Sequence, residues 1–176
     1  MVVTDNEAWA YKANYLTTQA KDDPVEYIHN EIGYNYRLTN IQAAIGVAQM
    51  EKLDEYVTAK RAIAGCYYER LSDLPGLTLP TEAAWAKSVF WLYTVLLDEV
   101  TYGMGSRDLL LKLQDAHILS RPLWQPIHTL RPFEGCYAYR VEVTNQLYRD
   151  GLSLPCSVGI QHEEQEQVIK VIKKLS

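Results

Sequence analysis

Residues 31–40, with the sequence E-I-G-Y-N-Y-R-L-T-N, gather side chains that can bind an anion. Asn35 offers a neutral amide, and Arg37 offers a planar set of donors that suits phosphate oxygens. The two flanking tyrosines can stack or hydrogen-bond, and Gly33 would permit an unusual backbone angle. A helical pattern follows at once, and a helix N-terminus favours negative charge. These residues alone fit an anion site or an ordinary polar turn.

A second candidate cluster lies at residues 121–128, which read R-P-L-W-Q-P-I-H. The Arg121 guanidinium can bind an anion, and the Trp124 indole and His128 imidazole can bind a planar group. The alternative is a surface loop stiffened by its two prolines. The residue types leave both interpretations open.

The rest of the sequence excludes several other kinds of site. The four histidines show no H-x-x-x-H or H-E-x-x-H spacing, so no metal site is predicted. The three cysteines include no C-x-x-C pair, which argues against a zinc site or a disulfide framework. A G-x-S-x-G nucleophile motif is absent from the sequence.

Charge and hydropathy narrow the class of partner. The net charge is -5 with a pI near 5.4, and no basic stripe is visible, so a nucleic-acid partner is not expected. The longest apolar stretch, near 89–97, is too short for a membrane span, and no signal peptide is recognised. The three widely spaced cysteines, with no sign of a disulfide framework, fit a reducing, cytoplasmic setting.

Periodicity and capping signals predict the elements that would position these clusters. Thr4 and Glu7 suggest a capping box, and Ser106 is expected to cap a helix. Pro155 suggests that its strand lies at a sheet edge, because proline cannot donate to a ladder. The expected helices are 5–18, 40–71, 106–115, 138–150 and 162–175, and the expected strands are the end of one at 1–4, then 88–97, 118–124 and 152–155.

These elements predict an α/β fragment. Residues 75–176 read as a small α+β domain, and the helix at 40–71 is long enough to bridge two domains or two subunits. The strand and helix before it resemble the end of an α/β layer. A turn at Asp22-Asp23-Pro24 is expected within the loop at 19–34.

The run from Gly33 to Gly46, G-Y-N-Y-R-L-T-N-I-Q-A-A-I-G, closely resembles the G-Y-N-Y-R-x-x-N-x-x-A-A-x-G segment of the DegT/DnrJ/StrS family. These are pyridoxal-phosphate-dependent sugar aminotransferases of fold type I. Residues 16–21, L-T-T-Q-A-K, are similar to members that act on nucleotide-linked 4-keto sugars, and favour a UDP-linked sugar. The segments 121–128 and 151–155 match signatures of the family's small domain.

The resemblance implies an organisation and a set of roles. Residues 1–40 would be a remnant of the cofactor-binding large domain, 41–74 a long connecting helix, and 75–176 the small C-terminal domain. Asn35 would reach across a homodimer to the phosphate of pyridoxal phosphate. The implied substrate-binding residues, near the diphosphate and in the nucleotide-sugar pocket, are Tyr36, Arg37, Arg121, Trp124 and His128.

One departure from the family is large. The family's Schiff-base lysine lies upstream of the strand that matches residues 1–4, and neither Lys12 nor Lys21 is in a matching context. No catalytic residue is therefore predicted in this chain. The chain is expected to be the C-terminal part of an enzyme that moves an amino group, from glutamate, to a nucleotide-linked 4-keto sugar. It would pair with itself or with a chain that carries the missing half. The alternative is a non-catalytic, degenerate or truncated member that acts as a dimerising module, and the sequence leaves open whether this chain alone is active.

Overall fold

The computed structural model describes residues 2–23 and 25–176, and the chain divides into two compact units, Met1–Lys52 and Leu53–Ser176. They are called the N-terminal and C-terminal units below. None of the helices among the described residues is both long and apolar enough to cross a membrane.

The N-terminal unit contains helices α1, Glu7–Thr17, and α2, Asn40–Glu51. The predicted Thr4–Glu7 capping box is wrong: Asn6 is the N-cap and accepts from the Trp9 N–H at 3.1 Å. The Thr4 hydroxyl instead accepts from the Asn6 N–H. Residues 2–4 form no strand, and Val2 and Val3 are exposed. Met1 lies outside the described residues, as does Pro24 of the predicted turn.

Helix α2 begins with a capping box in which Thr39 and Gln42 satisfy each other's backbone N–H groups. The predicted single helix at 40–71 is two helices, because α2 ends at Glu51 and α3 spans Leu53–Leu71. Lys52, at φ −104° and ψ 0°, separates them, whereas Gly46 and Gly65 lie inside helices. Apolar side chains of α2 are exposed, among them Ile41, Ile45, Val47 and Met50.

The C-terminal unit is built on an antiparallel sheet in the order β1-β2-β4-β3. Its strands are β1, Leu77–Thr78; β2, Tyr93–Leu97; β3, Arg121–Pro122; and β4, Gly151–Leu154. The prediction of an edge strand at 152–155 is wrong, since β4 pairs with both β2 and β3. Pro155 follows the last ladder pair, so its missing N–H costs the sheet nothing.

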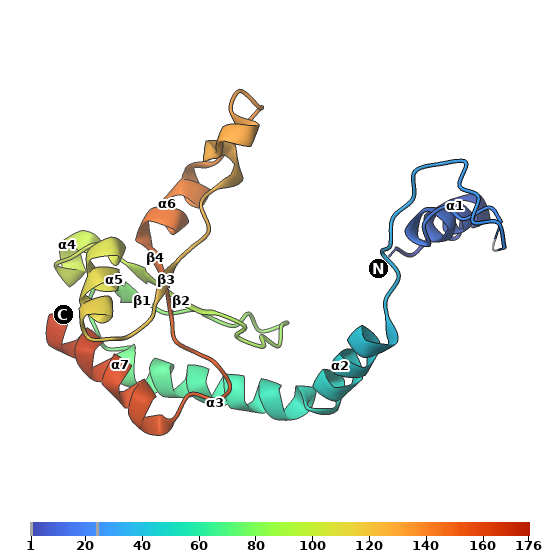
Figure 1. Ribbon diagram of the computed structural model, residues 1–176. Helices are drawn as coiled ribbons and strands as arrows, with labels where there is room; N and C mark the ends of the chain where they lie inside the picture. Colours follow the sequence, from blue (N-terminus) through green and yellow to red (C-terminus); the bar gives the residue numbers. More distant parts are fainter. Residues whose placement is uncertain (1, 24) are drawn as a thin grey trace. The chain divides into compact units, whose positions relative to one another are not determined.

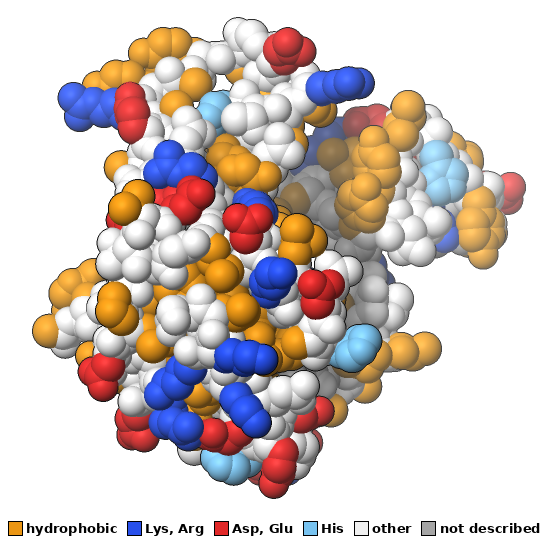
Figure 2. All heavy atoms as spheres, turned by 90° about the vertical axis from the view of Figure 1, so that its left-hand side faces the viewer, with side chains coloured by type: hydrophobic (Ala, Val, Ile, Leu, Met, Phe, Trp, Pro, Cys, Tyr) orange, Lys and Arg blue, Asp and Glu red, His pale blue; other side chains and the backbone are white. Residues whose placement is uncertain are grey.

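Helices α3, α5 (Ser106–Asp115) and α7 (His162–Leu175) cover this sheet, and Figure 1 shows α3 and α7 side by side. The short helix α4 spans Glu99–Tyr102, the 3-10 turns η1 and η2 span Ile127–Thr129 and Arg131–Phe133, and α6 spans Glu142–Asp150. The core residues with almost no exposure are Tyr67, Leu71, Tyr93, Val95, Leu109, Leu113, Leu152, Ile169 and Ile172. On the face drawn in Figure 2, acidic and basic side chains are interspersed.

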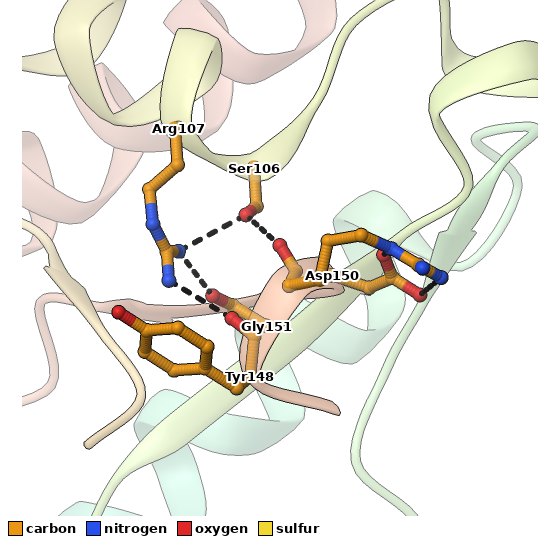
Figure 3. Close-up of polar contacts among 6 residues, drawn as sticks. Ser106, Arg107, Tyr148, Asp150 and Gly151 are labelled. Carbon is orange, nitrogen blue, oxygen red and sulfur yellow. Dashed lines mark hydrogen bonds and ion pairs between the residues drawn. The ribbon is translucent and has the colours of Figure 1, made fainter. Parts of the chain in front are cut away.

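The start of α5 is tied to the end of α6 (Figure 3). The prediction that Ser106 caps α5 is wrong, because Gly105 is the N-cap. The Ser106 hydroxyl instead donates to the Arg149 carbonyl at 2.5 Å. The Arg107 guanidinium donates to the carbonyls of Tyr148, at 2.9 Å, and Gly151, at 3.2 Å. These are carbonyls that a helix end leaves without intrahelical partners, so Arg107 acts as a C-terminal cap for α6.

Replacing Arg107 with methionine should lower the free energy of unfolding of the C-terminal unit by about 1–3 kcal/mol, because two partly buried carbonyls lose a charged donor. Arg149→Met is the matched control, since the Arg149 side chain is 72% exposed and forms its ion pair with the adjacent Asp150. Denaturant unfolding measures both variants. Equal stabilities for the two would contradict the capping role.

Candidate functional site

A cavity of about 550 Å³ opens in the C-terminal unit. Its walls come from α3, from β3 and the chain on either side of it, from the end of β4 and the segment that follows it, and from the residues that precede β2. The side chains that matter for chemistry are Lys60, Trp91, Arg121, Trp124 and Ser153. The structure therefore brings the predicted residues Arg121 and Trp124 to one cavity.

The two indoles of this cavity form a pair. The ring centroids of Trp91 and Trp124 lie 6.0 Å apart with an angle of 28° between planes. They remain 68% and 71% exposed, so the pair leaves aromatic surface free for a planar ligand.

Lys60 holds two of the segments that line the cavity. Its ammonium donates to the Trp91 carbonyl at 2.7 Å and to the Cys156 carbonyl at 2.5 Å, and lies 3.2 Å from the Cys156 sulfur. These bonds tie the segment before β2 and the segment after β4 to α3. The backbone that carries Trp91 is thus held at two points of the fold.

The charge of the cavity has one sign. Among the described residues that line it, Lys60 and Arg121 are the charged ones, and no carboxylate is present. Ser153 lies in the wall, and its hydroxyl is paired with that of Thr94 at 2.9 Å. Two cations, two exposed indoles and an apolar remainder suit an anion that carries a planar group.

The chain that leads to Trp91 is held by a second polar contact. The Arg61 guanidinium donates to Glu82 and, at 2.6 Å, to the Ser88 carbonyl. Glu82 also accepts from the Ser88 N–H at 2.7 Å. The hydrogen bonds from Arg61 and then from Ser88 lower the pKa of Glu82 below its ordinary value.

This lowered pKa gives a pH-dependent prediction. A carboxyl whose pKa is depressed by folding stabilises the fold above its unfolded pKa, and loses that effect as pH falls through the folded pKa. Glu82→Gln should therefore lower the melting temperature slightly at neutral pH, by about 1–3 °C for a solvent-screened pair. The difference from wild type should shrink below the ordinary pKa of glutamate. Thermal melts from pH 7 to acid pH check it, and a difference that is constant with pH would contradict it.

His128 does not lie in this cavity. It lines a separate hollow with Thr129, Arg131 and Glu134. The structure therefore divides the predicted 121–128 cluster between two places.

In the N-terminal unit, the predicted motif lies on a short exposed bridge. Asn35 pairs with Thr18 in an isolated antiparallel bridge, flanked by hydrogen bonds from Tyr34 N–H to the Leu16 carbonyl and from Tyr36 N–H to the Thr17 carbonyl. The rings of Tyr34 and Tyr36 stack with centroids 5.2 Å apart. The side chains of Asn35, Tyr36 and Arg37 are all exposed. The L-T-T-Q-A and G-Y-N-Y segments are thus hydrogen-bonded side by side. Neither segment's sequence predicted this pairing.

The reason for Gly33 differs from the predicted one. The structure does not place Gly33 in the left-handed region. A Cβ there would instead lie closer than 3.0 Å to the backbone of Gln19 and Ala20. Glycine is required because the two chain segments approach each other closely.

The residues present fit one contact to pyridoxal phosphate, not a complete site. The exposed Asn35 amide can donate to a phosphate oxygen. The two lysines of this unit that precede the motif are engaged elsewhere: Lys12 pairs with Glu31, and the Lys21 ammonium lies 4.2 Å from the centroid of the Tyr27 ring. No step of the chemistry is therefore assigned to a lysine of this unit.

Three of these five side chains, those of Lys60, Trp91 and Ser153, were not predicted from the sequence as part of a site. Trp91 read as part of a strand at 88–97, but the strand begins only at Tyr93. The positive φ of Phe90, 44°, turns the chain there. Lys60 read as an ordinary helix residue, and nothing in its local pattern distinguishes it.

The chain belongs to the DegT/DnrJ/EryC1/StrS aminotransferase family, whose model matches residues 1–173. It is 38% identical to EpsN of Bacillus subtilis (strain 168), over 99% of this chain and 45% of EpsN. It is 35% identical to the GDP-perosamine synthase of Caulobacter vibrioides, over 99% of this chain and 47% of that protein. The chain thus spans about half the length of the curated relatives that it matches.

Solved structures share the fold. The Helicobacter pylori aminotransferase PseC, involved in pseudoaminic acid biosynthesis, superposes with a TM-score of 0.82 at 23% identity, over 98% of this chain and 47% of PseC. The aminotransferase TlmJ of Streptoalloteichus hindustanus gives a TM-score of 0.83 at 22% identity, over 97% of this chain and 45% of TlmJ. The mixed α/β fold is therefore that of part of a sugar aminotransferase.

Proposed function

We propose that this chain provides the C-terminal part of a pyridoxal-phosphate-dependent aminotransferase that moves an amino group from glutamate to a nucleotide-linked 4-keto sugar. Bound pyridoxal phosphate would supply the electron sink for the amino transfer. The observation that carries the proposal is the cationic cavity with its exposed indole pair. A nucleotide sugar joins a planar base, a diphosphate and a polar ring, and this cavity suits the first two.

The family assignment supports a nucleotide-linked substrate. One relative, 35% identical, is a GDP-perosamine synthase, and another, 30% identical, is a dTDP-3-amino-3,4,6-trideoxy-alpha-D-glucose transaminase of Micromonospora megalomicea. Both names contain a nucleoside diphosphate. The same chemistry in this chain would use Arg121 for the diphosphate and Trp124 for the base.

The N-terminal unit would supply contacts of its own. Asn35 would donate to the cofactor phosphate across a homodimer, and Tyr36 and Arg37 would contact the diphosphate. His128 would contact the substrate from its separate hollow, which Arg131 also lines. In this proposal residues 1–40 belong to the large domain, 41–74 connect the two domains, and 75–176 form the small domain.

Reconstitution tests the proposal. The chain would be mixed with a polypeptide that carries the N-terminal portion of EpsN, together with pyridoxal phosphate, glutamate and a nucleotide-linked 4-keto sugar. We expect 2-oxoglutarate only from the mixture, and much less of it with Asn35→Ala. Control reactions contain each polypeptide alone.

Borohydride reduction keeps the test decisive if the two pieces fail to assemble. The chain alone, with pyridoxal phosphate and borohydride, should show no stoichiometric adduct by intact mass. A covalent adduct at one lysine would mean that this chain supplies its own cofactor lysine, and would overturn the proposal.

The exposed apolar side chains of α2 favour a second function, in which the chain is a non-catalytic dimerising module. Sedimentation of the chain alone, with Ile45→Ser as the variant, measures self-association. A stable dimer that binds no nucleotide sugar would favour this second function over the first.

A further inference from the structure

We infer that Trp91, together with Trp124, binds the base of the nucleotide by stacking, and that this indole pair makes the chain prefer purine over pyrimidine nucleoside diphosphates. The inference rests on the proposed function of the same cavity. It assigns specificity to Trp91, which neither the motifs nor the comparisons assign, and it runs counter to the UDP-linked sugar that the L-T-T-Q-A-K run favours.

The backbone around Trp91 is arranged to present the indole. Phe90 has a φ of 44°, in the left-handed region that a bulky residue rarely adopts. The turn directs the Phe90 ring toward the core, where it lies 6.3 Å from the Tyr93 ring, while Trp91 stays 68% exposed. Such local strain persists where the surrounding structure enforces it.

The surroundings do enforce it. The Trp91 carbonyl accepts from the Lys60 ammonium at 2.7 Å, and the Cys156 thiol lies 3.6 Å from the same carbonyl. Two residues before Phe90, the Ser88 carbonyl accepts from Arg61. The segment is thus anchored to α3 on both sides of the turn, so the backbone that carries the Trp91 indole is held in place before any ligand binds. A preorganised aromatic surface loses little conformational entropy on binding.

The inferred preference for a purine follows from the size of the stacked surfaces. The two indoles stack on each other, with centroids 6.0 Å apart and planes 28° from parallel, and each keeps exposed surface on which a base can stack. Base–aromatic stacking grows with the overlapping π surface, and a bicyclic purine has more of it than a pyrimidine. Arg121, in the same cavity, leaves the phosphates a cation at which to bind.

Titration of the full chain with GDP, UDP and inorganic pyrophosphate tests the inference, by calorimetry and by quenching of tryptophan fluorescence. GDP should bind more tightly than UDP, and UDP more tightly than pyrophosphate. Trp91→Leu should weaken GDP binding about tenfold, as expected for the loss of one stacking partner, and bring the affinities of GDP and UDP together. Trp91→Phe should retain much of the preference because it keeps an aromatic face.

Trp85→Leu is the matched control, because Trp85 is 90% exposed and does not line the cavity. It should leave every affinity unchanged. If the three probes bind equally, and Arg121→Gln weakens all of them, the anion-binding cavity stands and the stacking role of Trp91 is wrong. An unchanged ratio of GDP to UDP affinity in Trp91→Leu would also overturn the inference. If none of the probes binds, both the inference and the proposed substrate fail.

Discussion

Tyr67→Ala is expected to lower the free energy of unfolding of the C-terminal unit by about 3–5 kcal/mol, the range for truncating a large buried aromatic side chain. Tyr67 has no exposed surface, and its ring lies 5.0 Å from that of Tyr93. Its hydroxyl donates to the Pro155 carbonyl at 2.7 Å, which joins α3 to the segment that follows β4. Truncation would leave a cavity and an unsatisfied carbonyl together.

Two further variants separate these effects in urea unfolding monitored by near-UV circular dichroism. Tyr67→Phe keeps the ring and should cost only about 1 kcal/mol, for the lost hydrogen bond. Tyr68→Ala is the control. Tyr68 is the next residue in the chain and is 55% exposed, so this substitution should change stability little. Equal losses for Tyr67→Ala and Tyr68→Ala would show that Tyr67 does not anchor the core.

Gly33→Ala should disrupt the pairing that presents Asn35. The new methyl group would collide with backbone atoms of Gln19 and Ala20, which cannot move aside as a flexible side chain can. Overpacking against backbone should cost the N-terminal unit about 3 kcal/mol or more. The amide hydrogens of Gln19, Tyr34 and Tyr36 are bonded across this pairing, and their exchange with solvent should become much faster.

Gly46→Ala is the matched control within the same unit. Nothing lies within 4 Å of a Cβ at Gly46, which is inside α2. That substitution should stabilise the helix by up to about 1 kcal/mol, since alanine is the better helix former. Exchange rates measured by NMR compare the two variants. Wild-type exchange rates at Gln19, Tyr34 and Tyr36 in Gly33→Ala would contradict the close approach as the reason for the glycine.

Local patterns predicted the helices better than the sheet. The apolar spacing and terminal charges gave α7 its observed bounds, His162–Leu175, and the turn before α5 gave Ser106–Asp115. The order of the strands depends on pairings far apart in sequence, so Pro155 wrongly suggested an edge for β4. The predicted strands 88–97 and 118–124 are shorter in the structure. Part of the first apolar run forms the turn at Phe90, and the residues around β3 line the cavity.

The site shows the same division. Arg121 and Trp124 were recognisable because they lie in one short run with chemistry-bearing neighbours. Lys60 and Trp91 were not recognisable. Lys60 contacts Cys156, which lies 96 residues further along the chain, and the exposure of Trp91 depends on the turn at Phe90. Tertiary structure brings these four residues together, and no single segment of the sequence predicts that arrangement.

The central claim is that the cavity of the C-terminal unit binds a nucleotide sugar, and a calorimetric titration of the full chain with GDP-mannose and UDP-N-acetylglucosamine tests it most directly. We expect saturable binding of at least one of them, with one site per chain. Arg121→Gln should weaken it about tenfold to a hundredfold, as the loss of a charged hydrogen-bond donor predicts. Arg149→Gln serves as the control, because the Arg149 side chain is 72% exposed and does not line the cavity, and it should change the affinity much less. An absence of binding to wild type, or an Arg121→Gln affinity equal to that of wild type, would contradict the claim.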